Sequence, residues 1–141
     1  FGAIPFNHRE EGYQEKIIEA TDGKGVDIIL EMLSNVNLEN DITKLLGYRG
    51  RIIIIGCRGK VEINPRALMG KNGTIIGMVL VNSTKKELDE GFEAINAGLS
   101  NNTLYPIISP YSFKLDEASN AHKHIIDRPS GTIGKVIISP N

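Results

Sequence analysis

Short apolar runs alternate along the chain with stretches whose apolar residues recur at helical spacing. Tyr13, Ile17 and Ala20 stand at i, i+4 and i+7, which predicts a helix over residues 12–21. The elements predicted in this way are, in chain order, that helix, a strand at Val26–Glu31, a helix at Asn37–Leu46, strands at Arg51–Ile55 and Thr74–Val81, a helix over residues 84–98, an extended loop bracketed by Pro106 and Pro110, a helix carrying Ala118, Ala121 and Ile125, and a final strand at Lys135–Ile138.

Two of these predicted strands, Arg51–Ile55 and Thr74–Val81, are continuous apolar runs without a polar alternation. Such runs are typical of parallel strands that are buried on both faces by helices. Strand and helix also alternate along the chain, which predicts an α/β fold with a mainly parallel sheet.

The helix over residues 84–98 has the clearest sequence signals. Thr84 and Glu87 form a capping-box pattern at its start. An apolar stripe follows at i, i+4, i+7 and i+11, formed by Leu88, Phe92, Ile95 and Leu99. Asp116 and Glu117 similarly mark the first turn of the last predicted helix, where acidic residues are favoured.

Composition narrows the class of protein. The chain has 141 residues, of which 40% are hydrophobic and 23% charged, so it has the apolar content of one globular domain rather than of a disordered segment. Its 16 basic and 17 acidic residues give no support to electrostatic capture of nucleic acid. Neither a membrane-length apolar run nor a signal sequence is present, so we expect no membrane association and a cytoplasmic location.

The candidate chemistry lies at the predicted strand ends, because ligands of parallel sheets bind at the carboxyl edge. Gly56-Cys57-Arg58-Gly59 follows a strand directly, so Arg58 is a candidate partner for a phosphate; the alternative is a tight turn with a solvated arginine. Asn35 and Asn37 flank another strand end. Their amides are candidates for hydrogen bonds to a ligand; the alternative is a turn or a helix cap. No G-x-G-x-x-G phosphate-binding pattern occurs in the sequence.

Other reactive residues have simpler interpretations. Cys57 is the single cysteine and has no base near it in sequence, so a small residue filling a turn is the favoured interpretation over a nucleophile. His122 and His124 stand two residues apart on a helix and point to different sides, so they cannot bind one metal together. We therefore expect no metal site and name no catalytic residue.

Several segments resemble the NADPH:quinone oxidoreductases of the zeta-crystallin type, in the zinc-free branch of the medium-chain dehydrogenases/reductases. The segments that carry the resemblance are 6–10, 25–33, 35–38, 50–59, 62–66, 75–77 and 131–135. The resemblance implies an incomplete Rossmann-type doubly wound parallel sheet at residues 1–104, followed by a segment at 105–141 that returns to the catalytic domain. It also implies that the chain is the C-terminal portion of a larger enzyme, without the catalytic domain, the first two strands and the phosphate loop.

The resemblance further implies a set of NADPH contacts. These contacts carry over onto His8, Asn37, Ile55, Gly56, Cys57, Arg58, Met78, Val79 and Leu80. The family usually has serine where this chain has Cys57, so the position keeps a small residue, but the resemblance does not carry a hydroxyl contact onto it.

As a function, the resemblance implies part of the cofactor platform for hydride transfer from NADPH to a quinone-type acceptor, in an enzyme of which this chain alone is inactive. It also implies a homo-oligomer, a dimer or tetramer, joined through the Thr74–Val81 region. The alternative is a non-catalytic crystallin-like or RNA-binding protein, although the near-neutral charge gives RNA binding no support. Another Rossmann-like enzyme, such as a methyltransferase, fits the α/β pattern but not the motifs.

Overall fold

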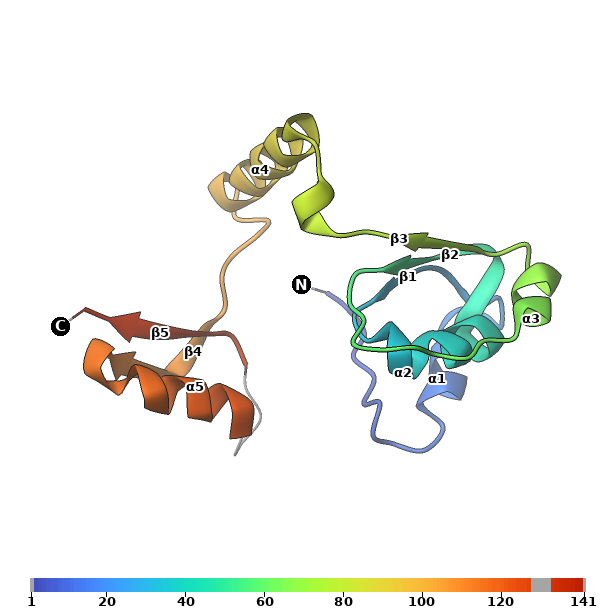
Figure 1. Cartoon of the computed structure of the whole chain (residues 1–141), viewed down its shortest axis with the longest axis horizontal. Helices are drawn as coiled ribbons and strands as arrows, with labels where there is room; N and C mark the ends of the chain where they lie inside the picture. The colour runs from blue at the N-terminus through green and yellow to red at the C-terminus, as the bar shows by residue number, and fades with distance from the viewer. Residues whose placement is uncertain (1, 128–132, 141) are drawn as a thin grey trace. The chain divides into compact units, whose positions relative to one another are not determined.

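The computed structural model describes residues 2–127 and 133–140. Gly131 and Thr132, which belong to the last of the resembling segments, lie outside the described residues. The chain forms two compact units, Phe1–Ser83 and Thr84–Asn141 (Figure 1).

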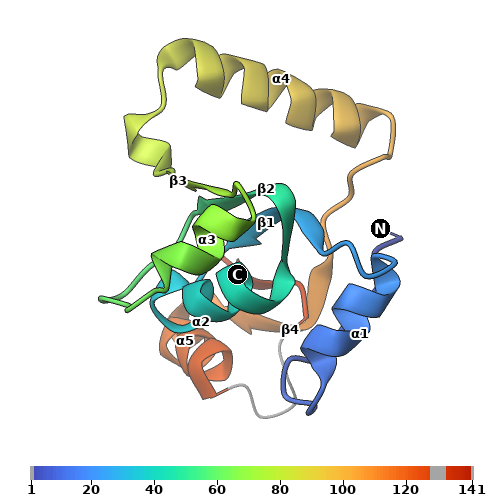
Figure 2. The same cartoon turned by 90° about the vertical axis from the view of Figure 1, so that its right-hand side faces the viewer.

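The first unit is a three-stranded parallel sheet in the order β1-β2-β3. Its elements are α1 (Tyr13–Ala20), β1 (Val26–Glu31), α2 (Ser34–Asn40), a π-helical turn (Asp41–Leu45), β2 (Leu46–Ile54), α3 (Pro65–Gly70), β3 (Thr74–Gly77) and a 3₁₀ turn (Leu80–Asn82). Figures 1 and 2 both show α1 and α2 on the same side of this sheet. The prediction of an α/β fold with a parallel sheet is confirmed.

The core of this unit lies between the sheet and the helices on one side of it. Leu38, Ile42, Leu46 and Ile52 are its buried centre. Because side chains alternate along a strand, Ile52 points into this core while its neighbours in sequence point away. On the opposite face Leu30 remains 65% exposed and Ile76 42% exposed. The expectation that the continuous apolar strands are buried on both faces is therefore wrong within this unit, because its helices cover one face.

In the first unit, a helix and two strands have boundaries that differ from the sequence prediction. The helix predicted at Asn37–Leu46 begins earlier, at Ser34, and ends in the π-helical turn. β2 begins at Leu46, which pairs with Val26; the chain then makes a detour in which Arg49 has a φ of 58°, and Arg51 pairs with Ile28. The strand predicted at Thr74–Val81 ends at Gly77, because pairing with β2 stops at Ile54.

The second unit contains a long helix and a two-stranded parallel sheet. Its elements are α4 (Lys85–Ser100), β4 (Ile108–Lys114), a 3₁₀ turn (Leu115–Glu117), α5 (Ala118–Asp127) and β5 (Lys135–Ser139). In Figure 1, α5 packs along β4 and β5. The stretch after Pro106 was expected to be a loop; instead Pro110 lies within β4, at an irregularity in its pairing with β5. Asp116 and Glu117 lie in the 3₁₀ turn before α5 rather than in its first turn.

In the described parts of the chain, no helix is both long and apolar enough to cross a membrane.

Candidate ligand-binding edge

The carboxyl ends of the three strands in the first unit are tied together by main-chain hydrogen bonds. The N–H groups of Ile55 and Gly56 both donate to the carbonyl oxygen of Glu31, at 2.9 and 3.1 Å. Met78 N–H donates to the carbonyl oxygen of Ile54 at 2.9 Å. The residues predicted at these strand ends therefore share one edge of the sheet.

Gly56, which begins the turn after β2, is packed tightly against the main chain that follows β1. A Cβ atom at this position would lie 2.1 Å from the main-chain oxygen of Met32, which follows β1. Ser34, the first residue of α2, donates from both its N–H and its hydroxyl to the Gly56 carbonyl oxygen, at 3.0 Å in each case. Close contact with the end of β1 thus explains the glycine and fixes where the turn leaves the sheet.

The turn over residues 57–59 is held by its neighbours while its side chains remain exposed. Arg58 N–H donates to Oδ1 of Asn35 at 2.8 Å, and Cys57 Sγ donates to the carbonyl oxygen of Gly59 at 3.0 Å. Arg58 itself is exposed. A guanidinium on a fixed turn at a strand edge can form charge-assisted hydrogen bonds to an anionic ligand.

Cys57 is exposed on the same turn. A hydrogen bond involving Ser34, and further backbone hydrogen bonds of Gly59 and Asn35, lower the pKa of the Cys57 thiol below its ordinary value. No histidine, aspartate or glutamate is hydrogen-bonded to the thiol among the described residues, so the structure adds no general base to this cysteine.

Asn37 lies on α2, and its side chain is hydrogen-bonded to a buried carboxylate. Its Nδ2 donates to both side-chain oxygens of Glu31, at 3.2 and 3.4 Å. Glu31 ends β1 and also accepts a hydrogen bond from Leu33 N–H. The Asn37 side chain is therefore fixed at the edge rather than free in solvent.

Behind Asn37 lies a second buried acid that sequence reasoning missed. Asp41 is 4% exposed and Glu31 6% exposed. Burial, together with the hydrogen-bonded and charged Glu31 beside it, raises the pKa of Asp41 to about 7. The two acids stand ten positions apart in sequence, in different elements. A possible signal was the Asn37/Asp41 spacing of i, i+4, which places both on one helical face.

The remaining predicted site residues are Met78, Val79, Leu80 and His8. Met78 and Val79 follow the end of β3, Leu80 begins the next 3₁₀ turn, and all three are exposed. His8 is exposed in the turn that precedes α1, and no hydrogen bond between described residues joins it to the strand ends. The structure thus brings together Asn37, Ile55, Gly56, Cys57, Arg58 and Met78 through the contacts above, but not His8.

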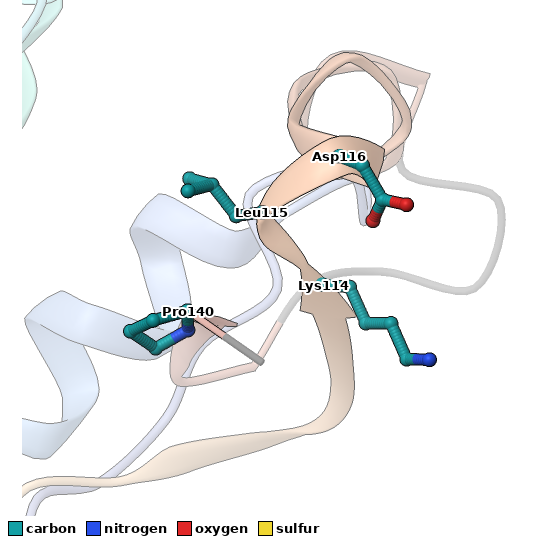
Figure 3. A pocket seen from close by; sticks show the side chains of 4 residues that line it. All are labelled: Lys114, Leu115, Asp116 and Pro140. Atoms are coloured by element: carbon teal, nitrogen blue, oxygen red, sulfur yellow. The ribbon is translucent and has the colours of Figure 1, made fainter.

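The edge presents three kinds of group to a ligand. Arg58 presents a guanidinium, Asn37 a fixed amide, and Met78, Val79 and Leu80 an exposed apolar surface. Among the described residues, no group of three or more His, Cys, Asp or Glu side chains is arranged to hold a metal ion. Figure 3 shows the residues that line a hollow at the carboxyl ends of β4 and β5 in the second unit: Lys114, Leu115, Asp116 and Pro140.

This parallel sheet has the Rossmann-type α/β fold of the medium-chain dehydrogenases/reductases. An alcohol dehydrogenase superfamily protein from Novosphingobium aromaticivorans matches 99% of the chain with a TM-score of 0.80, at 21% identity and over 43% of its own chain. The chain belongs to the zinc-binding dehydrogenase family, whose model matches residues 1–97.

Within that family the chain is similar to quinone oxidoreductases. It is 46% identical to the quinone oxidoreductase of Sus scrofa and 45% identical to that of Rattus norvegicus, over 133 residues and 94% of the chain in each case. The predicted resemblance is thereby confirmed. The chain spans 40% of the length of these two relatives.

Proposed function

We propose that this chain is part of an NADPH-dependent quinone oxidoreductase and supplies one side of its cofactor site. The observation that carries the proposal is the identity of 45–46% to two quinone oxidoreductases over 94% of the chain. The convergence of Asn37, Ile55, Gly56 and Arg58 at one sheet edge supports it, because ligands of such sheets bind at the carboxyl ends of the strands.

In this proposal the residues of the chain bind and orient the cofactor. Arg58 pairs with a phosphate, the fixed Asn37 amide bonds a hydroxyl or amide, and Met78, Val79 and Leu80 pack against an apolar part. His8 and Cys57 complete the proposed contacts. NADPH supplies the hydride when bound, and the protein contributes binding and positioning. The same proposal includes a domain division into residues 1–104 and 105–141, assembly into a dimer or tetramer, and a cytoplasmic location.

The proposal is tested by steady-state oxidation of NADPH with 1,4-benzoquinone as acceptor. The longer protein that carries this chain should turn over both reactants. The 141-residue chain alone should not, because it spans two fifths of the length of its relatives. Absence of NADPH-dependent turnover by the longer protein would overturn the proposal, and turnover by the isolated chain would overturn the division of labour within it.

A further inference from the structure

We propose that Glu31 and Asp41 share one proton and form a positioning pair that fixes the Asn37 amide with its carbonyl oxygen available to a ligand. The pair stands beneath the strand edge described above. The identity of the ligand rests on the proposed function, whereas the shared proton and the fixed amide rest on the contacts of the chain itself.

The two acids are placed by different elements, and both are buried. Glu31 is the last residue of β1, and Asp41 begins the π-helical turn after α2. The N–H of Asp41 donates to the carbonyl oxygen of Asn37, so these two residues stand one helical turn apart. Asp41 Oδ2 is buried without a hydrogen-bond donor among the described groups.

One proton shared between Asp41 and Glu31 removes the repulsion between them and gives the buried Asp41 oxygen a hydrogen-bond partner. The carboxyl groups of Asp41 and Glu31 interact directly, and two such groups repel each other when both are ionised, a cost that burial increases. If Asp41 carries the proton, its hydroxyl donates to Glu31, and the orphaned oxygen gains a partner. Glu31 then remains the anion that accepts from Asn37 and Leu33.

The cations of the surrounding elements bond elsewhere. Lys44 donates to Gln14 Oε1 at 3.1 Å, Lys71 to the carbonyl oxygen of Leu46 at 2.6 Å, and Lys16 pairs with Glu10 at 2.9 Å. Glu39, on α2, accepts from Asn64 N–H at 2.8 Å. The other charged side chains on the packed elements are exposed: Glu15, Glu19, Asp27, Arg49, Arg51 and Arg66. In the described structure, no ion pair therefore neutralises Asp41.

The orientation of Asn37 follows from the charge of Glu31. An anionic carboxylate accepts hydrogen bonds only, so it selects the Nδ2 end of the amide. Oδ1 of Asn37 accepts no hydrogen bond from the described residues and is left for a donor on the ligand. Under the proposed function, that donor is a hydroxyl or carboxamide N–H of the dinucleotide.

The pair also makes this orientation dependent on pH. Because the pKa of Asp41 lies at about 7, the shared proton is present in mildly acidic solution and is lost as the pH rises through neutrality. Loss of the proton leaves two buried anions, which weakens the fixed geometry of α2 at Asn37.

The first test is carbon-detected NMR of the chain, following the side-chain Cγ signals of Asn37 and Asp41 from pH 4.5 to 8.5. Both signals should shift in one common step near neutral pH. Asp41→Asn should remove the step from Asn37, because the new amide donates to Glu31 at every pH. Glu31→Gln should remove it as well, because its amide stabilises the Asp41 anion. Asp27→Asn, at an exposed site on β1, is the matched control and should retain the step.

An Asn37 signal without a step near neutral pH, or a step that persists in Asp41→Asn, would overturn the proposal. The wild-type titration decides this even if a variant fails to fold.

The second test measures the Kd of NADPH for the longer protein at pH 6 and pH 8, in wild type and Asp41→Asn. At each pH, the Kd of wild type is divided by the Kd of Asp41→Asn. Protonation of the cofactor's own phosphate, whose pKa is about 6, affects both proteins equally and therefore cancels in this ratio. Between these pH values, wild type should lose about two- to tenfold in affinity relative to Asp41→Asn. A constant ratio would overturn the positioning role, whereas failure of the wild type to bind NADPH at either pH would overturn the proposed function.

Discussion

Gly56 occupies the tightest position at the strand edge. A Cβ atom there meets the Met32 carbonyl oxygen at 2.1 Å, whereas a Cβ at Gly59 meets nothing nearer than Asn35 Cβ at 3.9 Å. The glycine at the start of the turn is therefore required by contact between strands, and the glycine at its end is not.

Gly56→Ala should destabilise the first unit by about 1–3 kcal/mol or more, because backbone must move to admit the methyl group. Gly59→Ala is the matched control and should change the free energy of unfolding by about 0.5 kcal/mol or less. Urea unfolding followed by the protection of β2 amides measures both. Equal stability of the two variants would contradict the close packing described for Gly56.

The raised pKa of Asp41 also predicts how stability depends on pH. Its ordinary value is 3.8 and its value in the fold is about 7, so between these values the folded chain binds more protons than the unfolded chain. The free energy of unfolding should therefore fall as the pH rises from about 4 to about 7, and this contribution should level off above that.

In Asp41→Asn this fall should disappear, while exposed Asp27→Asn should keep it. Urea titrations at a series of pH values, read at β2 amides, provide the measurement. The prediction would be contradicted if the free energy of unfolding of wild type rose from about pH 4 to about pH 7, or if its fall persisted in Asp41→Asn.

Among the elements, local sequence signals predicted some boundaries well. β1 occupies the predicted residues Val26–Glu31, and the Thr84 capping box begins α4 as expected. β2 was predicted too short because Leu46 pairs with Val26 across a detour, and no local pattern encodes that pairing. The predicted site residues on the turn after β2 follow from strand order, but the Glu31–Asp41 contact depends on how β1 and α2 pack in three dimensions.

The capping box at α4 provides a local test of helix stability. Thr84 N–H donates to Glu87 Oε2 at 2.7 Å, and Glu87 N–H donates to Thr84 Oγ1 at 3.3 Å. Thr84→Ala should destabilise α4 by about 1 kcal/mol, within a usual range of roughly 0.5–2 kcal/mol. Thr84→Ser keeps the hydroxyl and should behave close to wild type. Amide hydrogen exchange in the first turns of α4 distinguishes them, and equal exchange in Ala and Ser variants would show that the cap contributes nothing.

For the molecule as a whole, β3 is an edge strand of the first unit's sheet and carries the partly exposed Ile76. Edge strands with apolar residues pair readily with other chains. We therefore predict that the longer protein forms a dimer or tetramer through this edge. Ile76→Lys should shift sedimentation at micromolar concentration toward the monomer, whereas Ile126→Lys, at an exposed position of α5, should not. A wild-type protein that sediments as a monomer would contradict the prediction.

If the fixed turn after β2 binds the cofactor, as proposed, Arg58→Ala should weaken the NADPH affinity of the longer protein. Loss of a charge-assisted hydrogen bond costs about 1.5–3 kcal/mol, or roughly ten- to a hundredfold in Kd. The KM for NADPH should rise accordingly while kcat is largely spared, because the contact is made in ground and transition states alike. Arg66→Ala removes an exposed arginine from α3 and should leave the Kd unchanged. An Arg58→Ala protein that binds NADPH as tightly as wild type at low salt would show that this turn does not bind the cofactor.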